Sequence, residues 1–179
     1  EVRALQSGDP SEAGTLVGPI IDDDQLESVL DVLERTKEAG ATVALGGTHE
    51  GRVVQPTVLT GVTQDMPAAE EEIFGPLAPI LTFETDEEAL EIANATPYGL
   101  SGSVFTGSTE RGLRLARQVQ TGMIHVNDMS VNDEPHVAFG AMRESGLGRF
   151  GGKWALDAFT TVQWVSVQHE PRTYPFSAE

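Results

Sequence analysis

The sequence contains no cysteine, and this absence is the strongest constraint that it imposes on function. Without a thiol, residues 1–179 can form neither a disulfide nor a thiolate zinc site, and they supply no cysteine nucleophile. The chain also has no run of about 18 apolar residues, so no transmembrane helix is expected. Residues 1–10 are polar and lack a basic start followed by an apolar block, so they do not form a signal peptide.

Basic residues are scarce, and lysine is nearly absent: Lys37 and Lys153 are the only two. With 28 acidic against 11 basic residues, the formal charge is −17, which argues against nucleic acid and anionic membranes as partners. Two explanations stay open, a proteome adapted to high salt and an ordinary acidic cytosolic protein. Apolar residues make up 39 % of the chain, enough for a folded core, and a cytoplasmic location is expected.

Apolar periodicity predicts helices that alternate with short strands. The acidic first turn at Asp22 and the stop at Gly40 bound one amphipathic helix. The alternation predicts an α/β fold with a largely parallel sheet and flanking helices. The expected strands are 41–45, 53–59 (with Pro56 indicating an edge or bulge), 78–83, 102–106 and 123–126, and further helices begin at caps Asp86 and Thr109.

Beyond residue 126 the pattern changes to a long irregular stretch, 127–152, rich in glycine. Long loops in compact domains are often functional. A short helix is expected over 153–158. Residues 159–168 then alternate with a period of two and carry apolar side chains on both faces, which predicts a strand that packs on two sides. A polar arm follows from Glu170.

The residues by themselves form no complete catalytic constellation. None of the four histidines has metal-ligand spacing, so no metal site is expected. His125 lies between apolar neighbours on a predicted strand, and it is expected to be a structural residue whose hydrogen bonds are satisfied. The glycines in 145–149 follow no strand and open no long helix, so they are interpreted as turn residues rather than a dinucleotide fingerprint.

Three glutamates, residues 70–72, precede Phe74. Two interpretations stand side by side. The segment could be a charged loop before a buried strand. Alternatively, one carboxylate faces a cleft and accepts hydrogen bonds from a ribose diol, with Phe74 as a flat apolar wall beside it.

Several short motifs follow one another along the chain: GPIID (18–22), QPTVL (55–59), EEIFGP (71–76), NATPYGLS (94–101), GSVFT (102–106), GMIHVN (122–127), FG (139–140) and SGLGR (145–149). In this order they resemble the aldehyde dehydrogenase superfamily, and specifically its C-terminal part. The resemblance spans residues 8–168, and each motif alone is weakly specific. A narrower set, in 125–127, 131–135, 148–152, 159–160 and 171–176, is similar to the benzaldehyde, vanillin and salicylaldehyde dehydrogenases.

The resemblance implies oxidation of an aldehyde through a cysteine thioester, with NAD or NADP as hydride acceptor, and its narrower part implies an aromatic aldehyde. In the family the cysteine, the water-activating glutamate and the dinucleotide-binding domain precede this segment. Glu72 matches the ribose-contacting glutamate, and Phe74 matches the aromatic residue near the nicotinamide ribose. Phe139 matches a wall of the aldehyde pocket, and Asn127 begins the loop, 127–137, that rims its entrance.

The same resemblance divides the chain in two. Residues 1–150 match the C-terminal part of the catalytic domain, and 151–179 match a short helix, an oligomerisation strand and an arm. A homo-oligomer formed through residues 159–168 is therefore expected. The chain does not begin with methionine, as expected for a piece of a longer protein.

Some residues depart from the family pattern. Ala138, Ala141, Met142 and Arg143 stand where the family commonly has proline, glycine and a nearby lysine, which bears on the loop geometry and the substrate class. Two alternatives to an aromatic-aldehyde enzyme remain. One is a non-catalytic assembly or binding module that pairs through its last strand. The other is a segment of an aliphatic semialdehyde dehydrogenase.

Overall fold

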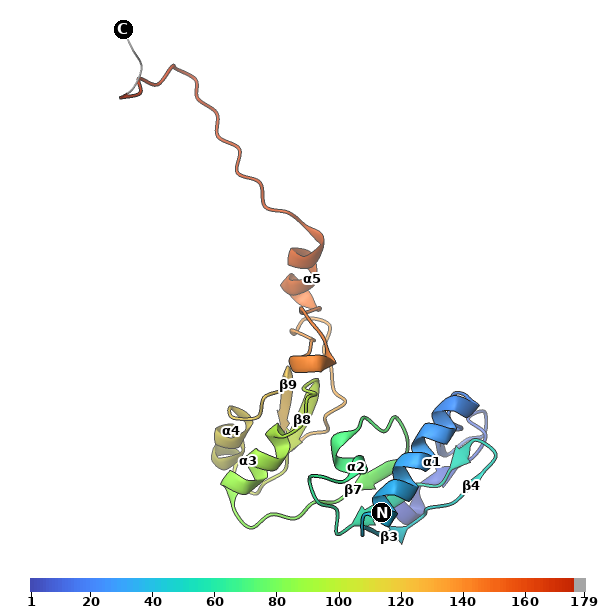
Figure 1. Ribbon diagram of the computed structural model, residues 1–179. Coiled ribbons are helices and arrows are strands. Elements are labelled where there is room, and N and C mark those ends of the chain that lie inside the picture. Colours follow the sequence, from blue (N-terminus) through green and yellow to red (C-terminus); the bar gives the residue numbers. More distant parts are fainter. Residues whose placement is uncertain (176–179) are drawn as a thin grey trace.

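The computed structural model describes residues 1–175 as short sheets flanked by helices, followed by an extended arm (Figure 1). No helix in this described part is both long enough and apolar enough to cross a membrane. The helices are η1 (Val2–Ala4), α1 (Asp23–Glu38), α2 (Pro67–Glu70), α3 (Asp86–Asn94), α4 (Thr109–Ala116), η2 (Arg143–Ser145) and α5 (Gly152–Phe159). The strands are β1 (Gln6–Ser7), β2 (Thr15–Val17), β3 (Thr42–Leu45), β4 (His49–Glu50), β5 (Val53–Val54), β6 (Thr57–Thr60), β7 (Leu77–Pro79), β8 (Ser101–Val104) and β9 (Met123–Val126).

Helix α1 forms where its capping residues and apolar spacing predict. The side chain of Asp22 accepts a hydrogen bond of 2.8 Å from the backbone N–H of Gln25, which satisfies one of the free donors of the first turn. The chain leaves the helix at Gly40, whose φ of 115° is accessible to glycine without strain. The predicted helix is confirmed.

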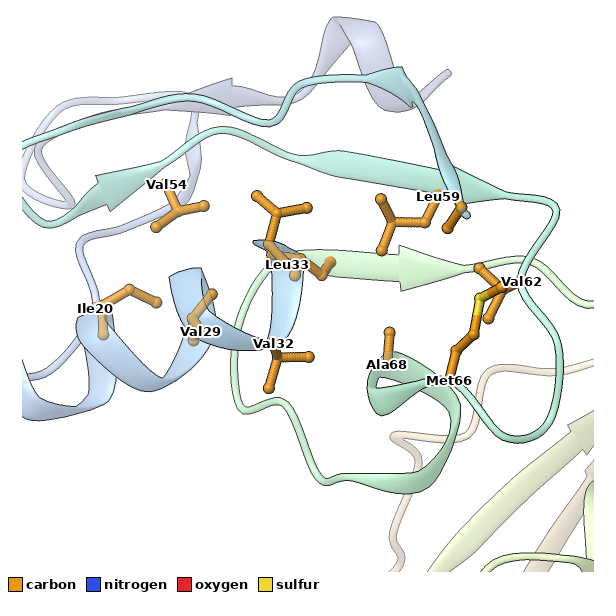
Figure 2. Close-up of a cluster of buried hydrophobic side chains, with 11 residues drawn as sticks. Ile20, Val29, Val32, Leu33, Val54, Leu59, Val62, Met66 and Ala68 are labelled. Atoms are coloured by element: carbon orange, nitrogen blue, oxygen red, sulfur yellow. The ribbon is translucent and has the colours of Figure 1, made fainter. Parts of the chain in front are cut away.

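One hydrophobic core lies between α1, α2 and the sheet β3-β6-β7. Figure 2 shows Val29, Val32 and Leu33 of α1 with Leu59 of β6 and Ala68 of α2, and all of these side chains are buried. Thr36, fully buried, connects the two helices. Its hydroxyl donates to the carbonyl oxygen of Val32 at 2.6 Å and accepts from the N–H of Ala68 at 3.0 Å.

A second group of elements, α3, α4, β8 and β9, has a much smaller core. Strands β8 and β9 pair in parallel, with Ser101 opposite Met123 and Val104 opposite Val126. The buried apolar residues among the described part of this region are Ala116 and Ala141, both small. Large side chains such as Phe105, which is 71 % exposed, remain on its surface. The fold of the first group is therefore supported by packing far more than that of the second.

The sheets are mixed, so the prediction of one largely parallel sheet is not confirmed. Strand β6 pairs with β7 in parallel but with β3 antiparallel. The connection from β3 to β6 contains only the hairpin β4–β5 and no crossover helix, so the chain returns antiparallel. Pro56, which has no backbone N–H, separates β5 from β6 and divides the single strand expected over 53–59. The caps of α3 and α4 are Thr85 and Ser108, one residue before those expected.

The strand expected over residues 159–168 is also absent from the described part. Phe159 ends α5, and residues 160–168 are extended chain without a strand neighbour (Figure 1). Val162 and Trp164 are 98 % and 91 % exposed. A strand requires a neighbour to take up its backbone donors and acceptors, and within residues 1–175 no strand pairs with this segment. Phe176, the end of the closing motif, and the last three residues of the arm lie outside the described residues.

Candidate functional site

The acidic segment that follows α2 is anchored to α1 by Glu71. Arg35 Nη1 and Nη2 donate to Glu71 Oε1 and Oε2 at 2.8 and 2.9 Å, a bidentate pair. Hydrogen bonding to Arg35 lowers the pKa of the Glu71 carboxyl below its ordinary value. Arg35 also binds Asp31 at 2.7 Å, so its guanidinium is held from two sides. Glu71 is thus part of the scaffold.

Glu72 and Phe74 project from this anchored segment. Glu72 is exposed and lines a cavity of about 800 Å³. Phe74 is 70 % exposed and has a φ of 46°, an uncommon backbone conformation for a non-glycine residue. Gly75 allows the close approach to α1, because a Cβ there would lie 2.7 Å from Val29 Cγ2. The contact at Gly75 and the ion pair of Glu71 therefore hold the backbone of residues 71–75 close to α1, with the side chains of Glu72 and Phe74 exposed.

The large cavity lies among α3, α4 and β8, and its walls are mainly apolar. Phe83, Leu90 and Leu115 contribute to it, and Asp86 and Arg111 give it a polar edge. Arg111 Nε donates to Asp86 Oδ2 at 3.0 Å, and Arg114 Nη2 donates to the same oxygen at 3.0 Å. The Arg111 hydrogen bonds are the main cause of the lowered pKa of the Asp86 carboxyl. The ion pairs of Asp86 with Arg111 and Arg114 therefore join the start of α3 to α4.

A smaller cavity of about 300 Å³ lies beside β9 and is lined by Phe139 together with loop residues Asn132, Asp133 and Glu134. Phe139 and Phe150 form an antiparallel bridge, with N···O distances of 3.0 and 2.6 Å, which closes the 139–150 loop. The structure therefore brings Phe139 and the predicted entrance loop together.

Asn127 does not join that group. Its side-chain oxygen accepts a hydrogen bond of 2.7 Å from the N–H of Thr106, and Asn127 does not line the smaller cavity. With a φ of 59°, it turns the chain at the end of β9. Its observed contact is structural, so a direct role at the substrate stays a prediction.

Glu72 and Phe139 line different cavities, so the predicted cofactor and substrate residues are not brought into one cavity by this chain. The expectation for His125 is confirmed only in its position on β9. Its Nε2 is buried, and within residues 1–175 no hydrogen-bond partner reaches it. No cluster of three or more metal-ligating side chains occurs in that same part of the chain.

Arg143 departs from the family pattern, and the sequence alone predicts no contact for it. Its guanidinium binds Asn94 at the end of α3, Thr96 just after α3, and Gln120 in the segment after α4. A large charged residue within a glycine-rich stretch was the available signal.

The sequence pattern of the aldehyde dehydrogenase family matches residues 1–165. This chain belongs to that family. It is 48 % identical to a benzaldehyde dehydrogenase of Bacillus subtilis over 98 % of its own length and 36 % of that enzyme. It is also 48 % identical to a vanillin dehydrogenase of Corynebacterium glutamicum, covering 93 % of this chain and 34 % of the relative. The chain thus spans about a third of the length of these aldehyde dehydrogenases.

Solved aldehyde dehydrogenases share the fold. An NAD-dependent aldehyde dehydrogenase from Sinorhizobium meliloti superimposes with a TM-score of 0.92 at 35 % identity, over 98 % of this chain and 36 % of that one. A Mycobacterium tuberculosis aldehyde dehydrogenase complexed with NAD+ gives 0.85 at 36 % identity, over 89 % and 34 %. The α/β character is therefore shared with family members of known structure.

Proposed function

We propose that this chain is the C-terminal part of an NAD(P)-dependent aldehyde dehydrogenase that oxidises aromatic aldehydes to carboxylic acids through a cysteine thioester. Residues 1–150 would complete the catalytic domain, and 151–179 would serve assembly. The arrangement at Glu71 and Glu72 carries the proposal: Arg35 holds one carboxylate, and the adjacent one lines a cavity. Phe74, two residues further on, is exposed, although it does not line that cavity. The names of the benzaldehyde and vanillin dehydrogenase relatives support the aromatic class.

The residues present fit one wall of a dinucleotide site. No hydrogen bond or ion pair engages the Glu72 carboxylate within the described part of the chain, so both oxygens can accept from the hydroxyls of a ribose. Phe74 offers its ring face to a planar or sugar group. The bound dinucleotide supplies the hydride acceptor. Glu72 and Phe74 orient it, and the remaining walls belong to the longer protein.

On the substrate side, Phe139 provides an apolar surface of the size of an aromatic aldehyde ring. Phe139 is 36 % exposed, and its backbone is fixed by the bridge to Phe150. An aromatic pair of this kind adds about 0.5–1.5 kcal/mol beyond area burial. This preference favours an aromatic over a small aliphatic substrate.

The test is turnover by the purified chain and by the longer protein that contains it. The chain alone has no cysteine to form the thioester, so we expect no aldehyde-dependent formation of reduced nicotinamide. We also expect weak or no NAD(P) binding by calorimetry, because a single wall is present. Turnover or tight binding by the isolated chain would contradict the proposal.

The alternatives differ in what the longer protein does. A panel of aromatic and short aliphatic aldehydes, tested on the longer protein, distinguishes an aromatic from a semialdehyde enzyme through the ratio of kcat/KM values. If the DNA before the codon for Glu1 encodes no cysteine and no nucleotide fold, the assembly-module alternative takes precedence.

A further inference from the structure

Only three non-glycine residues in the described part of the chain have a positive φ: Phe74, Asn127 and Arg143. Two of them are predicted site residues. Backbone strain of this kind persists where the surrounding structure enforces it, and it concentrates at functional sites. The third residue, Arg143 with a φ of 56°, therefore needs an explanation of its own.

The surroundings of Arg143 show what enforces its conformation. Its Nη1 donates to the carbonyl oxygens of Asn94, at 2.8 Å, and of Thr96. Its Nη2 donates to Oε1 of Gln120. One guanidinium thus binds acceptors from the end of α3 and from the segment after α4, two places far from Arg143 in sequence.

The backbone on either side of Arg143 is joined to the same region. The N–H of Met142 donates to the carbonyl oxygen of Gly99 at 2.8 Å, and the N–H of Glu144 donates to that of Pro97 at 3.1 Å. Ser145 Oγ accepts from the N–H of Gly99 at 2.9 Å. Side chain and backbone together make a hydrogen-bonded junction of three segments.

This junction lies close to Phe139 in the sequence, and Phe139 is itself held by the bridge to Phe150. Only Gly140 and Ala141 separate Phe139 from Met142, and Ala141 is buried. A second guanidinium, that of Arg149, binds the carbonyl oxygen of Ala141 at 2.6 Å. Gly140 also passes close to Gly122, whose missing Cβ would meet the Gly140 carbonyl. Phe139 therefore has little freedom as long as the junction holds.

We propose that Arg143 is a positioning residue, which helps to fix Phe139 against the smaller cavity by joining the 139–146 segment to the end of α3 and to the segment after α4. A planar guanidinium presents several donors in a fixed arrangement and reaches all three acceptors at once, whereas a lysine ammonium on a flexible stem does not reproduce that geometry. The structural part stands on the geometry alone, and the consequence for substrate selection rests on the proposed function.

The structural part is tested by amide hydrogen exchange on the full chain, with Arg143→Lys and Arg143→Gln. We expect the Met142 and Glu144 amides to exchange about tenfold faster, since bonds to a charged donor contribute appreciably to local stability. Leu33, in the core of α1, should keep its rate. The matched control is Arg117→Gln, at an exposed arginine just after α4. This variant should leave the exchange rates of the Met142, Glu144 and Leu33 amides unchanged. Unchanged rates at Met142 and Glu144, or an equal acceleration at Leu33, would overturn the proposal.

The functional part is tested in the longer enzyme. We expect Arg143→Lys to raise KM for an aromatic aldehyde by about tenfold, because a misplaced wall costs substrate alignment. KM for the dinucleotide should change less than KM for the aldehyde: Thr96, Gly99, Gln120 and Ser145 of the junction line the larger cavity, but Glu72 and Phe74 themselves lie outside the junction. Equal changes in both constants, or none, would overturn the assignment. An unmodified enzyme that oxidises no aldehyde would instead refute the proposed function and leave the exchange result standing.

Discussion

Arg35 and Glu71 form a bidentate ion pair, with N···O distances of 2.8 and 2.9 Å, that joins α1 to the acidic segment after α2. Because Glu72 follows directly, the pair separates the roles of two adjacent and chemically identical side chains. One carboxylate is neutralised as an anchor, and the next projects toward a cavity.

We therefore expect Glu72→Gln, in the longer enzyme, to raise KM for the dinucleotide by about ten- to a hundredfold. The reason is that a hydrogen bond to a charged group contributes about 1.5–3 kcal/mol, against about 0.5–1.5 kcal/mol for a bond between neutral groups, and a ribose diol can make two such bonds. Steady-state kinetics with varied NAD and NADP measure the effect.

The matched control is Glu71→Gln, which removes an equal charge one residue away. It should leave KM for the dinucleotide within about threefold and act on stability, by about 1 kcal/mol or less because the pair is exposed. A larger KM effect at Glu71 than at Glu72 would mean that the roles are reversed.

The core between α1 and the β3-β6-β7 sheet should dominate the stability of the chain. Leu33 is 1 % exposed, so Leu33→Ala should lower the free energy of unfolding by about 3 kcal/mol through lost burial and the cavity left behind. Urea denaturation followed by circular dichroism measures the change. Leu147→Ala is the control: at 97 % exposure its effect should stay within about 0.5 kcal/mol.

Elements whose causes are local could be predicted from the sequence. Asp22 and Gly40 bound α1 because a cap and a left-handed stop act within a few residues. Strand β9, Met123–Val126, was also predicted at its observed bounds. The strand over 159–168 was not observed, because alternation describes a chain that could pair and says nothing about whether a neighbour is present.

For the site, the sequence proposes residues but not their contacts. Glu72 and Phe74 are predicted site residues because they lie in one contiguous motif. The sequence could not predict that Glu71 forms an ion pair while Glu72 stays unpaired within residues 1–175, because this difference depends on Arg35, 36 positions before Glu71. The role of Arg143 was hidden for the same reason: its acceptors on Asn94 and Gln120 lie 49 and 23 positions away.

Acid should weaken the ion pairs of Asp86 with Arg111 and Arg114, which connect α3 to α4. The pKa of Asp86 lies below its ordinary value near 3.8 because Arg111, and then Arg114, bind the ionised form. A lowered folded-state pKa stabilises the fold above pH 3.8 and loses that contribution as the pH falls through the lower folded value. Asp86→Asn should therefore be less stable than the unmodified chain at neutral pH, and the difference should shrink toward pH 2.

The measurement is the urea midpoint of both proteins across this pH range, at low ionic strength because the arginines are exposed and salt screens them. A difference that stays constant with pH would show that packing rather than charge underlies the effect. Repeating the series in concentrated salt should reduce the difference at neutral pH.

The exposed arm should self-associate. Val162 and Trp164 are almost fully exposed, and no strand pairs with residues 160–168 in the described part of the chain. Pairing with a strand of a second copy would bury these apolar side chains and would also give the backbone N–H and C=O groups their hydrogen bonds. We expect sedimentation velocity to show a concentration-dependent species larger than the monomer, and Trp164→Asp to abolish it. Gln168→Asp adds the same charge to the same arm without removing an apolar side chain, so it should preserve association. If both variants dissociate the assembly equally, electrostatic repulsion rather than strand pairing controls it, and a strictly monomeric parent chain would refute self-association through this arm.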